Sequence, residues 1–165
     1  MKSEKVYEVT IYKRPTKDEY YLDIALAVSK RSTCLKRHYG CVIVKDDIIV
    51  ATGYNGSPRG EENCCNRGTC KRAEAERYTS YEKCDAIHAE QNALMAASFQ
   101  QLNGATLYLA CEEYGINQEK SAMWEEEILD FHEDKEPAPC PLCQRMLKNS
   151  GIVRVVNREG DIQCL

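Results

Sequence analysis

Apolar and polar positions change their period several times along this chain, and each change marks an expected helix or strand. Residues 17–31 carry apolar side chains at helical spacing. Thr16 and Glu19 stand three apart at the start of this range in a capping-box pattern, so a helix is predicted here. Residues 40–45 and 47–53 are two apolar runs separated by a short polar turn, and they predict a β-hairpin.

Downstream of the hairpin the pattern alternates between helix and strand. A helix is expected from His88 onward, a buried strand over residues 105–111, a second helix after Cys140, and a strand over residues 152–156. Residues 162–165 are expected to return as a short antiparallel strand. This alternation predicts an α/β domain with helices on both faces of its sheet and with the two late helices side by side.

The other segments have less regular patterns. Residues 1–12 alternate enough for an edge strand, and an ordered arm fits them equally well. Residues 31–40 and 54–60 are rich in turn-forming residues, and residues 61–84 are polar and carry several cysteines, so all three are expected to be loops. No internal repeat is visible, and a single domain is expected over residues 1–165.

Chain length and composition indicate the cell compartment in which the protein is expected. A chain of 165 residues can bury a substantial core, and none of its apolar runs approaches the ~18 residues of a membrane span. The first residues lack the apolar segment of a secretory signal, so a cytoplasmic protein is expected. The chain has ten cysteines, which in a reducing compartment favour metal binding over disulfides.

The negative charge of the chain is concentrated in one segment. Residues 112–139 contain ten Asp or Glu and two Lys, a local charge of −8 in a chain of net charge −4, so the remainder carries +4. A broad basic face for nucleic acid is therefore not expected, whereas a modestly positive pocket for a small anion fits the pattern. Between Ser121 and Phe131 the apolar spacing predicts an amphipathic helix, which would serve as a lid or as a contact between subunits.

The strongest chemical signal comes from His88, Cys140 and Cys143. Pro139 and the helix expected after it would place both thiols at a helix N-terminus, where the unpaired N–H groups and the helix dipole favour thiolates. Thiolates and imidazole are zinc ligands, and three protein ligands leave the fourth tetrahedral position to water, as in catalytic sites. A disulfide between Cys140 and Cys143 is the alternative, which a reducing compartment disfavours.

Glu90 follows His88 by two residues, and side chains at that spacing diverge by about 200° on a helix, so Glu90 is not expected to share the metal. A carboxylate beside the metal suits proton transfer from water to a ring nitrogen and then to a departing amine. Together, H-x-E and P-C-x-x-C form the signature of zinc-dependent nucleobase deaminases. Glu90 is therefore predicted to be the proton shuttle of a zinc hydrolase.

On these motifs the chain resembles the cytidine and deoxycytidylate deaminase superfamily, most strongly its deoxycytidylate branch, over roughly residues 18–156. The shared stretches are residues 31–40, the expected hairpin, Gly-Tyr-Asn-Gly-Ser-Pro from Gly53, His-Ala-Glu-Gln-Asn-Ala from His88, Gly-Ala-Thr-Leu-Tyr from Gly104, Pro-Cys-x-x-Cys from Pro139, and Ser-Gly-Ile from Ser150. The resemblance implies a three-layer α/β/α fold whose central mixed sheet of about five strands is flanked by helices. It also implies hydrolysis of dCMP to dUMP and ammonia by a homo-oligomer, with dCTP and dTTP as effectors.

The same resemblance implies which residues lie near the substrate. Asn55 would hold the nucleotide, with Gly56 and Ala89 close to it, although the residues around Asn55 would also fit a plain turn.

In this branch a structural zinc is held by residues ahead of the first strand, after the Gly-Tyr-Asn-Gly loop and just before the His-Ala-Glu helix. Cys34, Cys64 and Cys84 match those places, and the fourth ligand would be Cys70, with Cys65 as the alternative. Four sulfurs would close the shell, as structural zinc requires; otherwise these are reduced cysteines in a loop.

Departures from the family leave other functions open. Residues 97–100 lack the basic side chain that members commonly offer to the substrate phosphate, residues 112–138 are an acidic insertion, and the family's usual last helix and strand do not follow. A deaminase of an unphosphorylated nucleoside or base, such as cytidine or guanine, and a catalytically inactive, zinc-stabilised regulatory protein are therefore alternatives. Deamination within nucleic acid is disfavoured because no basic track is evident.

Overall fold

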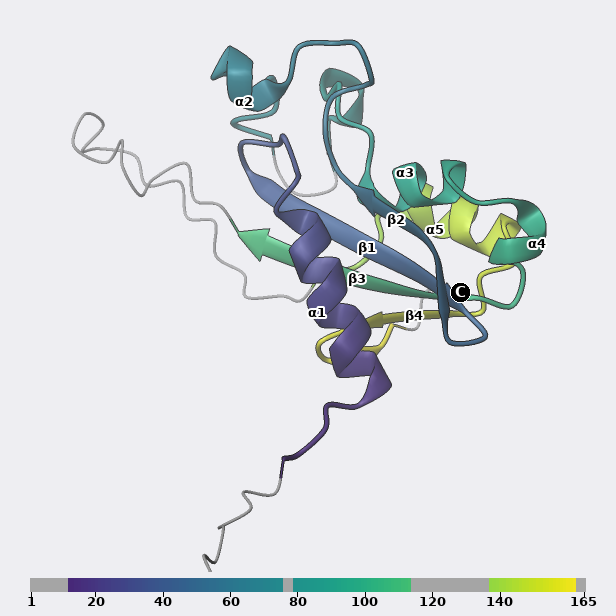
Figure 1. Ribbon diagram of the computed structural model, residues 1–165. Helices are drawn as coiled ribbons and strands as arrows, with labels where there is room; N and C mark the ends of the chain where they lie inside the picture. Colours follow the sequence, from purple (N-terminus) through teal and green to yellow (C-terminus); the bar gives the residue numbers. More distant parts are fainter. Residues whose placement is uncertain (1–11, 76–78, 114–136, 163–165) are drawn as a thin grey trace, which may run out of the picture.

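The computed structural model describes residues 12–75, 79–113 and 137–162, which build a five-stranded sheet with helices on both faces (Figure 1). The strand order is β2-β1-β3-β4-β5. The strands are β1 Arg37–Lys45, β2 Ile48–Tyr54, β3 Thr106–Glu113, β4 Arg154–Asn157 and β5 Gly160–Asp161. The sheet is mixed because β3 and β4 are parallel and the other neighbouring pairs are antiparallel. The predicted α/β architecture is confirmed.

Helix α1, Lys17–Ser29, covers one face of the sheet. It begins where expected because the capping box forms: the Glu19 N–H donates to Thr16 Oγ1 at 3.2 Å, and the Thr16 N–H donates to Glu19 Oε2 at 2.7 Å. Its apolar side packs on the sheet in a buried cluster of Tyr21, Leu22, Ala25, Val42, Val44, Tyr108, Ala110 and Val156.

Strands β1 and β2 form the predicted hairpin. Asp46 and Asp47 make the turn with positive φ angles of 50° and 64°, which is the type I′ geometry that matches the strand twist. β1 starts earlier than expected, because residues 37–39 pair with residues 111–113 of β3. The loop prediction was wrong for these residues, since pairing with a distant strand outweighs the low strand preference of a polar local sequence.

Three short helices cover the opposite face: α3 Ala89–Met95, α4 Phe99–Leu102 and α5 Pro141–Asn149. The helix expected after His88 is divided because Ser98 caps a new one, its Oγ accepting from the Gln101 N–H at 3.4 Å. α3 and α5 lie side by side, as predicted (Figure 1). The second buried cluster consists of Cys41, Ile43, Ala51, Ala89, Ala93, Leu102, Ala105, Leu107, Leu109, Leu147, Ile152 and Val155.

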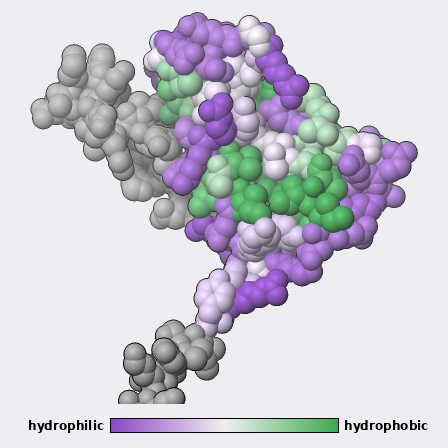
Figure 2. Space-filling model, viewed as in Figure 1, coloured by the Kyte–Doolittle hydropathy of each residue, from purple (hydrophilic) through white to green (hydrophobic). Residues whose placement is uncertain are grey.

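The cysteine-bearing segment between β2 and α3 contains two short helical turns, α2 Cys64–Arg67 and the 3-10 turn η1 Tyr81–Lys83, where an irregular loop was expected. Figure 2 shows hydrophilic residues over the end of the molecule that carries α2, and hydrophobic residues near the centre, over α1 and the hairpin. No helix in the described part of the chain is long and apolar enough to cross a membrane.

Several expected elements lie partly or wholly beyond the described ranges. β5 pairs antiparallel with β4, so a returning strand exists, but it precedes residue 162, and residues 163–165 are not described. The strand or arm expected over residues 1–12 also lies outside the description, apart from Tyr12. So does the amphipathic helix expected between Ser121 and Phe131.

Gly53 of β2 lies against the backbone of α3. A Cβ at this position would stand 2.2 Å from the Ala89 carbonyl oxygen and 2.5 Å from the Ala93 nitrogen. Gly53→Ala is therefore expected to push α3 away from β2 and to lower the free energy of unfolding by about 3 kcal/mol. Urea unfolding would measure this, with Thr52→Ala, an exposed neighbour, as the control. Equal unfolding midpoints for Gly53→Ala and the wild type would contradict the close contact.

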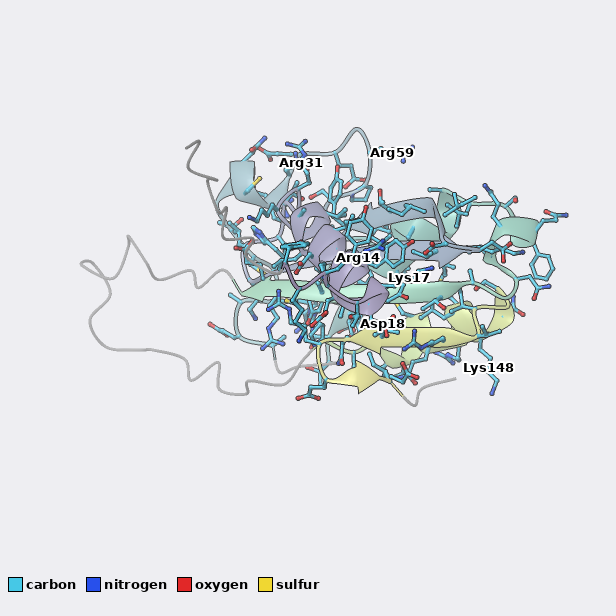
Figure 3. The ribbon with its side chains drawn as sticks, turned by 60° about the horizontal axis from the view of Figure 1, so that its bottom comes forward. Arg14, Lys17, Asp18, Arg31, Arg59 and Lys148 are labelled. Atoms are coloured by element: carbon cyan, nitrogen blue, oxygen red, sulfur yellow. The ribbon has the colours of Figure 1, made fainter. Side chains whose placement is uncertain are left out.

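Asp18 connects α1 to two strands. Its Oδ1 accepts from the Tyr108 hydroxyl at 2.8 Å, and its carboxylate pairs with the Arg154 guanidinium at 2.8 and 3.0 Å. Figure 3 shows Asp18 at the start of α1, close to β4. The hydrogen bond from Arg154 lowers the pKa of Asp18. The resulting stabilisation is complete above the unfolded-state pKa of about 4 and is lost as the pH falls through the lower folded-state pKa.

Asp18→Asn is expected to lower the free energy of unfolding at pH 7 by less than about 1 kcal/mol, because the Asp18 and Arg154 side chains both remain 37% exposed. The difference from the wild type should shrink once the pH falls below about 4. Urea unfolding at pH 7 and near pH 3 would measure it, with the exposed Asp23→Asn as the control. A difference that stays constant between the two pH values would contradict this assignment.

Candidate active site

His88 stands at the N-cap of α3, with φ −72° and ψ 157°. Its backbone N–H donates to Gln91 Oε1 at 2.9 Å, which closes the first turn of the helix. Its imidazole Nδ1 lies 3.5 Å from Cys140 Sγ and 3.4 Å from Cys143 Sγ. The structure therefore brings together the three residues predicted to hold the catalytic zinc.

Both cysteines belong to the N-terminal turn of α5. Cys140 is the N-cap and Pro141 the first helical residue, and the Cys143 N–H donates to Cys140 Sγ at 3.5 Å. Hydrogen bonding from Cys143, followed by that from His88, lowers the pKa of Cys140 to about 3. The same hydrogen bond, in which Cys143 is the donor, raises the pKa of Cys143. A bound divalent cation would favour the thiolate form of both sulfurs.

The three donors fit zinc in type and in spacing. One imidazole nitrogen and two sulfurs suit a borderline-soft cation. Ligands at Zn–N and Zn–S distances of ~2.0–2.1 and ~2.3 Å in a tetrahedron lie about 3.5 Å apart. The observed N···S separations of 3.4 and 3.5 Å agree with that spacing. All three ligand atoms lie within 4.8 Å of one another.

Glu90 lies in the first turn of α3, two residues beyond the metal donor His88, and only 5% of its surface is exposed. Burial raises the pKa of its carboxyl, and hydrogen bonds with its own backbone and with Cys143 oppose that rise. A carboxyl whose pKa is displaced toward neutrality both accepts and donates a proton readily near neutral pH. The position and environment of Glu90 are thus compatible with the predicted proton shuttle.

The side chain of Asn55, predicted to hold the substrate, already makes three hydrogen bonds within the protein. Its Oδ1 accepts from Ser32 Oγ at 2.7 Å and from the Tyr39 N–H at 2.8 Å, and its Nδ2 donates to the Arg37 carbonyl at 3.0 Å. Asn55 therefore fastens Ser32, ahead of β1, and the first residues of β1 to the end of β2. One amide hydrogen is left beyond the bond to Arg37.

The neighbouring residues predicted to approach the substrate have different surroundings. Gly56 and Ile87 form an isolated bridge with N···O distances of 3.1 and 2.8 Å, which brings the Asn55 loop beside the start of α3. Ala89 has no exposed surface and belongs to the buried cluster between α3 and the sheet. The side chain of Ala89 therefore takes part in core packing.

The cysteines predicted for a second zinc lie in two arrangements. Burial raises the pKa of Cys34, and Cys70 and Cys84 lie near enough to raise it further. Cys64 instead accepts a hydrogen bond from Arg67 Nη2 at 3.3 Å, and Cys65 is exposed. Among the described residues, His88, Cys140 and Cys143 are the only three whose ligand atoms all lie within 4.8 Å of one another. The second zinc therefore stays a prediction. Cys140 and Cys143 form no disulfide with each other.

Sequence patterns missed two residues beside this site. The Tyr81 ring lies 5.4 Å from the His88 ring, centroid to centroid, and the Arg72 guanidinium lies 4.7 Å from the centre of the Tyr81 ring. Both belong to the cysteine-bearing segment, which has no periodic pattern. No local signal in the sequence could have indicated these contacts.

A histidine and two cysteines at adjoining helix N-termini, with a buried glutamate beside them, define the class of zinc-dependent deaminases. Comparison with known proteins names the family. The model of the cytidine and deoxycytidylate deaminase zinc-binding region matches residues 15–158, and this chain belongs to that family.

Its relatives include deoxycytidylate deaminases of different lengths. The enzyme of Mycobacterium phage D29 is 35% identical over 150 residues, covering 87% of this chain and 94% of the relative. That of Schizosaccharomyces pombe is 44% identical over 98 residues, covering 58% of this chain and 30% of the relative, so this chain spans under a third of that protein. A solved structure of the dCMP deaminase of cyanophage S-TIM5, in complex with dCMP and dUMP, shares the fold with a TM-score of 0.56. The two chains are 24% identical, and the match covers 88% of this chain and 82% of that one.

Proposed function

We propose that this protein hydrolyses dCMP to dUMP and ammonia, with zinc held by His88, Cys140 and Cys143 and with Glu90 as the proton shuttle. The observation that carries the proposal is the approach of three metal donors to one another beside a buried carboxyl. The substrate follows from the relatives, because a phage protein named deoxycytidylate deaminase matches most of this chain and nearly all of its own length.

Zinc bound at this site would lower the pKa of a water molecule to about 7, so that hydroxide is available at neutral pH. Glu90 would take a proton from the attacking water and pass it to the ring nitrogen next to C4 of cytosine. As the C4–O bond forms and the C4–N bond breaks, Glu90 would deliver the second proton of the water to the departing amine. The products are then the uracil ring and ammonia, and Glu90 returns to its starting state.

The remaining residues would position the nucleotide and the surrounding loops. Asn55 would offer its remaining amide hydrogen to the nucleotide while its other bonds hold the start of β1. Gly56 would keep that loop against the start of α3, and Ala89 would line the same end of the helix. A structural zinc would be bound by Cys34, Cys64, Cys70 and Cys84, with Cys65 as the alternative to Cys70.

One observation favours an unphosphorylated substrate instead. Phe99, at the start of α4, is 58% exposed, and no basic side chain stands in residues 97–100. If no other cation takes the place of the basic side chain that family members commonly carry here, a substrate phosphate would lack a positively charged partner.

Ammonia release from the zinc-loaded protein, with dCMP, deoxycytidine, cytidine and guanine given separately, tests the proposal. We expect dCMP to be the preferred substrate, and dCTP and dTTP to change its rate in opposite directions. Equal rates with dCMP and deoxycytidine would indicate an enzyme indifferent to phosphate. No turnover with any of them would favour the regulatory protein. Light scattering of the same sample would test the expected homo-oligomer.

A further inference from the structure

The contact between Tyr81 and His88 has a geometry that restrains the imidazole. The two rings lie 5.4 Å apart at an interplanar angle of 54°, within the 4.5–7 Å range of attractive ring pairs. The Nδ1 atom of the same imidazole faces the sulfurs of Cys140 and Cys143. A metal-bound histidine needs its ring held in one orientation, and proteins usually achieve this through groups around the ligand. At His88 the ring of Tyr81 is placed to do so.

Arg72 in turn restrains Tyr81. Its guanidinium lies 4.7 Å from the ring centre, inside the ~6 Å limit of a cation–π contact, and its Nη2 donates to the Thr79 carbonyl at 2.5 Å. The backbone of Arg72 is itself held, because Lys36 Nζ donates to the Arg72 carbonyl at 2.5 Å and to the Ala73 carbonyl at 2.8 Å. The contacts therefore run from the chain before β1, through Arg72 and Tyr81, to His88.

These contacts join the cysteine-bearing segment to the metal donors. In Figure 1 this segment, in teal, includes α2 and descends directly into α3, at whose N-cap His88 stands. Tyr81 belongs to η1, the last helical turn before His88, and Ser80 ahead of it adopts a left-handed conformation with φ 53°. That conformation is uncommon for a residue other than glycine, so surrounding contacts must hold it.

We propose that Tyr81 is a positioning residue for His88, braced by Arg72, and that this contact slows the loss of zinc from the site. The inference rests on the proposed zinc site and is independent of the substrate. A Tyr81 that only filled space would leave the metal unaffected once the protein is folded. A Tyr81 that orients the imidazole would change both the retention of the metal and the geometry of its ligands.

The test measures the metal without any substrate. The zinc-loaded protein is mixed with excess chromogenic chelator, and the rate of zinc release is followed for the wild type, Tyr81→Phe, Tyr81→Ala and Arg72→Ala. Zinc that the wild type releases and Cys143→Ser does not release comes from this site, because that variant lacks one of the donors. Visible spectra of the cobalt-substituted proteins report the ligand geometry. Tyr12→Ala, which removes a 79% exposed ring on the chain before α1, is the matched control.

We expect Tyr81→Ala to release this zinc about 10–100-fold faster than the wild type, with a shifted cobalt spectrum. Tyr81→Phe keeps the ring and should behave like the wild type, as should Tyr12→Ala, whereas Arg72→Ala should show a smaller acceleration. If Tyr81→Ala does not fold, Tyr81→Leu takes its place, because leucine keeps apolar bulk without the ring.

Wild-type zinc release and spectrum in the folded Ala or Leu variant would overturn the inference, and so would Tyr81→Phe behaving like Tyr81→Ala. Failure of the wild type to hold zinc at this site would instead overturn the proposed function.

Discussion

Glu90→Gln is expected to lower the turnover of dCMP by at least about 10²–10⁴-fold while the zinc content stays at the wild-type level. Glutamine keeps the shape of the side chain and its ability to form hydrogen bonds, but it cannot take up or deliver a proton. Because Glu90 is 5% exposed and in the first turn of α3, the substitution needs no rearrangement of the helix. The turnover number and zinc analysis together separate a proton-transfer role from metal binding.

Glu82→Gln is the control for this variant. Glu82 is an exposed carboxylate of η1, in the same segment as His88 but turned to solvent, so its replacement should leave turnover unchanged. Turnover of Glu90→Gln close to that of Glu82→Gln would remove Glu90 from the mechanism. Loss of zinc together with activity would show that Glu90 supports the metal instead.

The second large effect is expected for Cys143→Ser, which should lose one zinc equivalent per chain and fall to background turnover. Cys143 has no exposed surface and is one of the three donors, and a neutral hydroxyl is a much poorer zinc ligand than a thiolate. Metal that binds the folded state stabilises it, so added zinc should raise the melting temperature of the wild type more than that of the variant. Zinc analysis and thermal unfolding with and without zinc would measure both effects.

Cys111→Ser is the matched control, because Cys111 is a cysteine of β3 outside the donor group. It should keep the zinc content and turnover of the wild type. An unchanged zinc content in Cys143→Ser would place the metal elsewhere in the chain, and the mechanism built on His88 and Cys140 would then fail with it.

Several elements were predictable because their signals are local. The capping box of Thr16 and Glu19 determines where α1 begins, since its partners lie within one helical turn. The hairpin follows from two apolar runs and a short turn. The helix expected after Cys140 is α5, which begins at Pro141 because proline favours the first helical position. The donors were recognisable for a similar reason: their residue types and short spacings carry the chemistry.

Long-range contacts decided the rest. Residues 37–39 are strand because β3 pairs with them, and Asn55 is bound internally because the start of β1 lies beside it. Tyr81 lies beside the donor His88, and Arg72 beside Tyr81, because of packing in a segment that has no periodic sequence pattern.

The sequence by itself predicted the three candidate metal donors, the helices beside which they stand, and the class of fold, because local spacing and periodicity encode them. The tertiary structure alone decided how the donors approach one another and which residues surround them. Such contacts depend on the relative placement of elements far apart in the chain, and no local pattern records that placement.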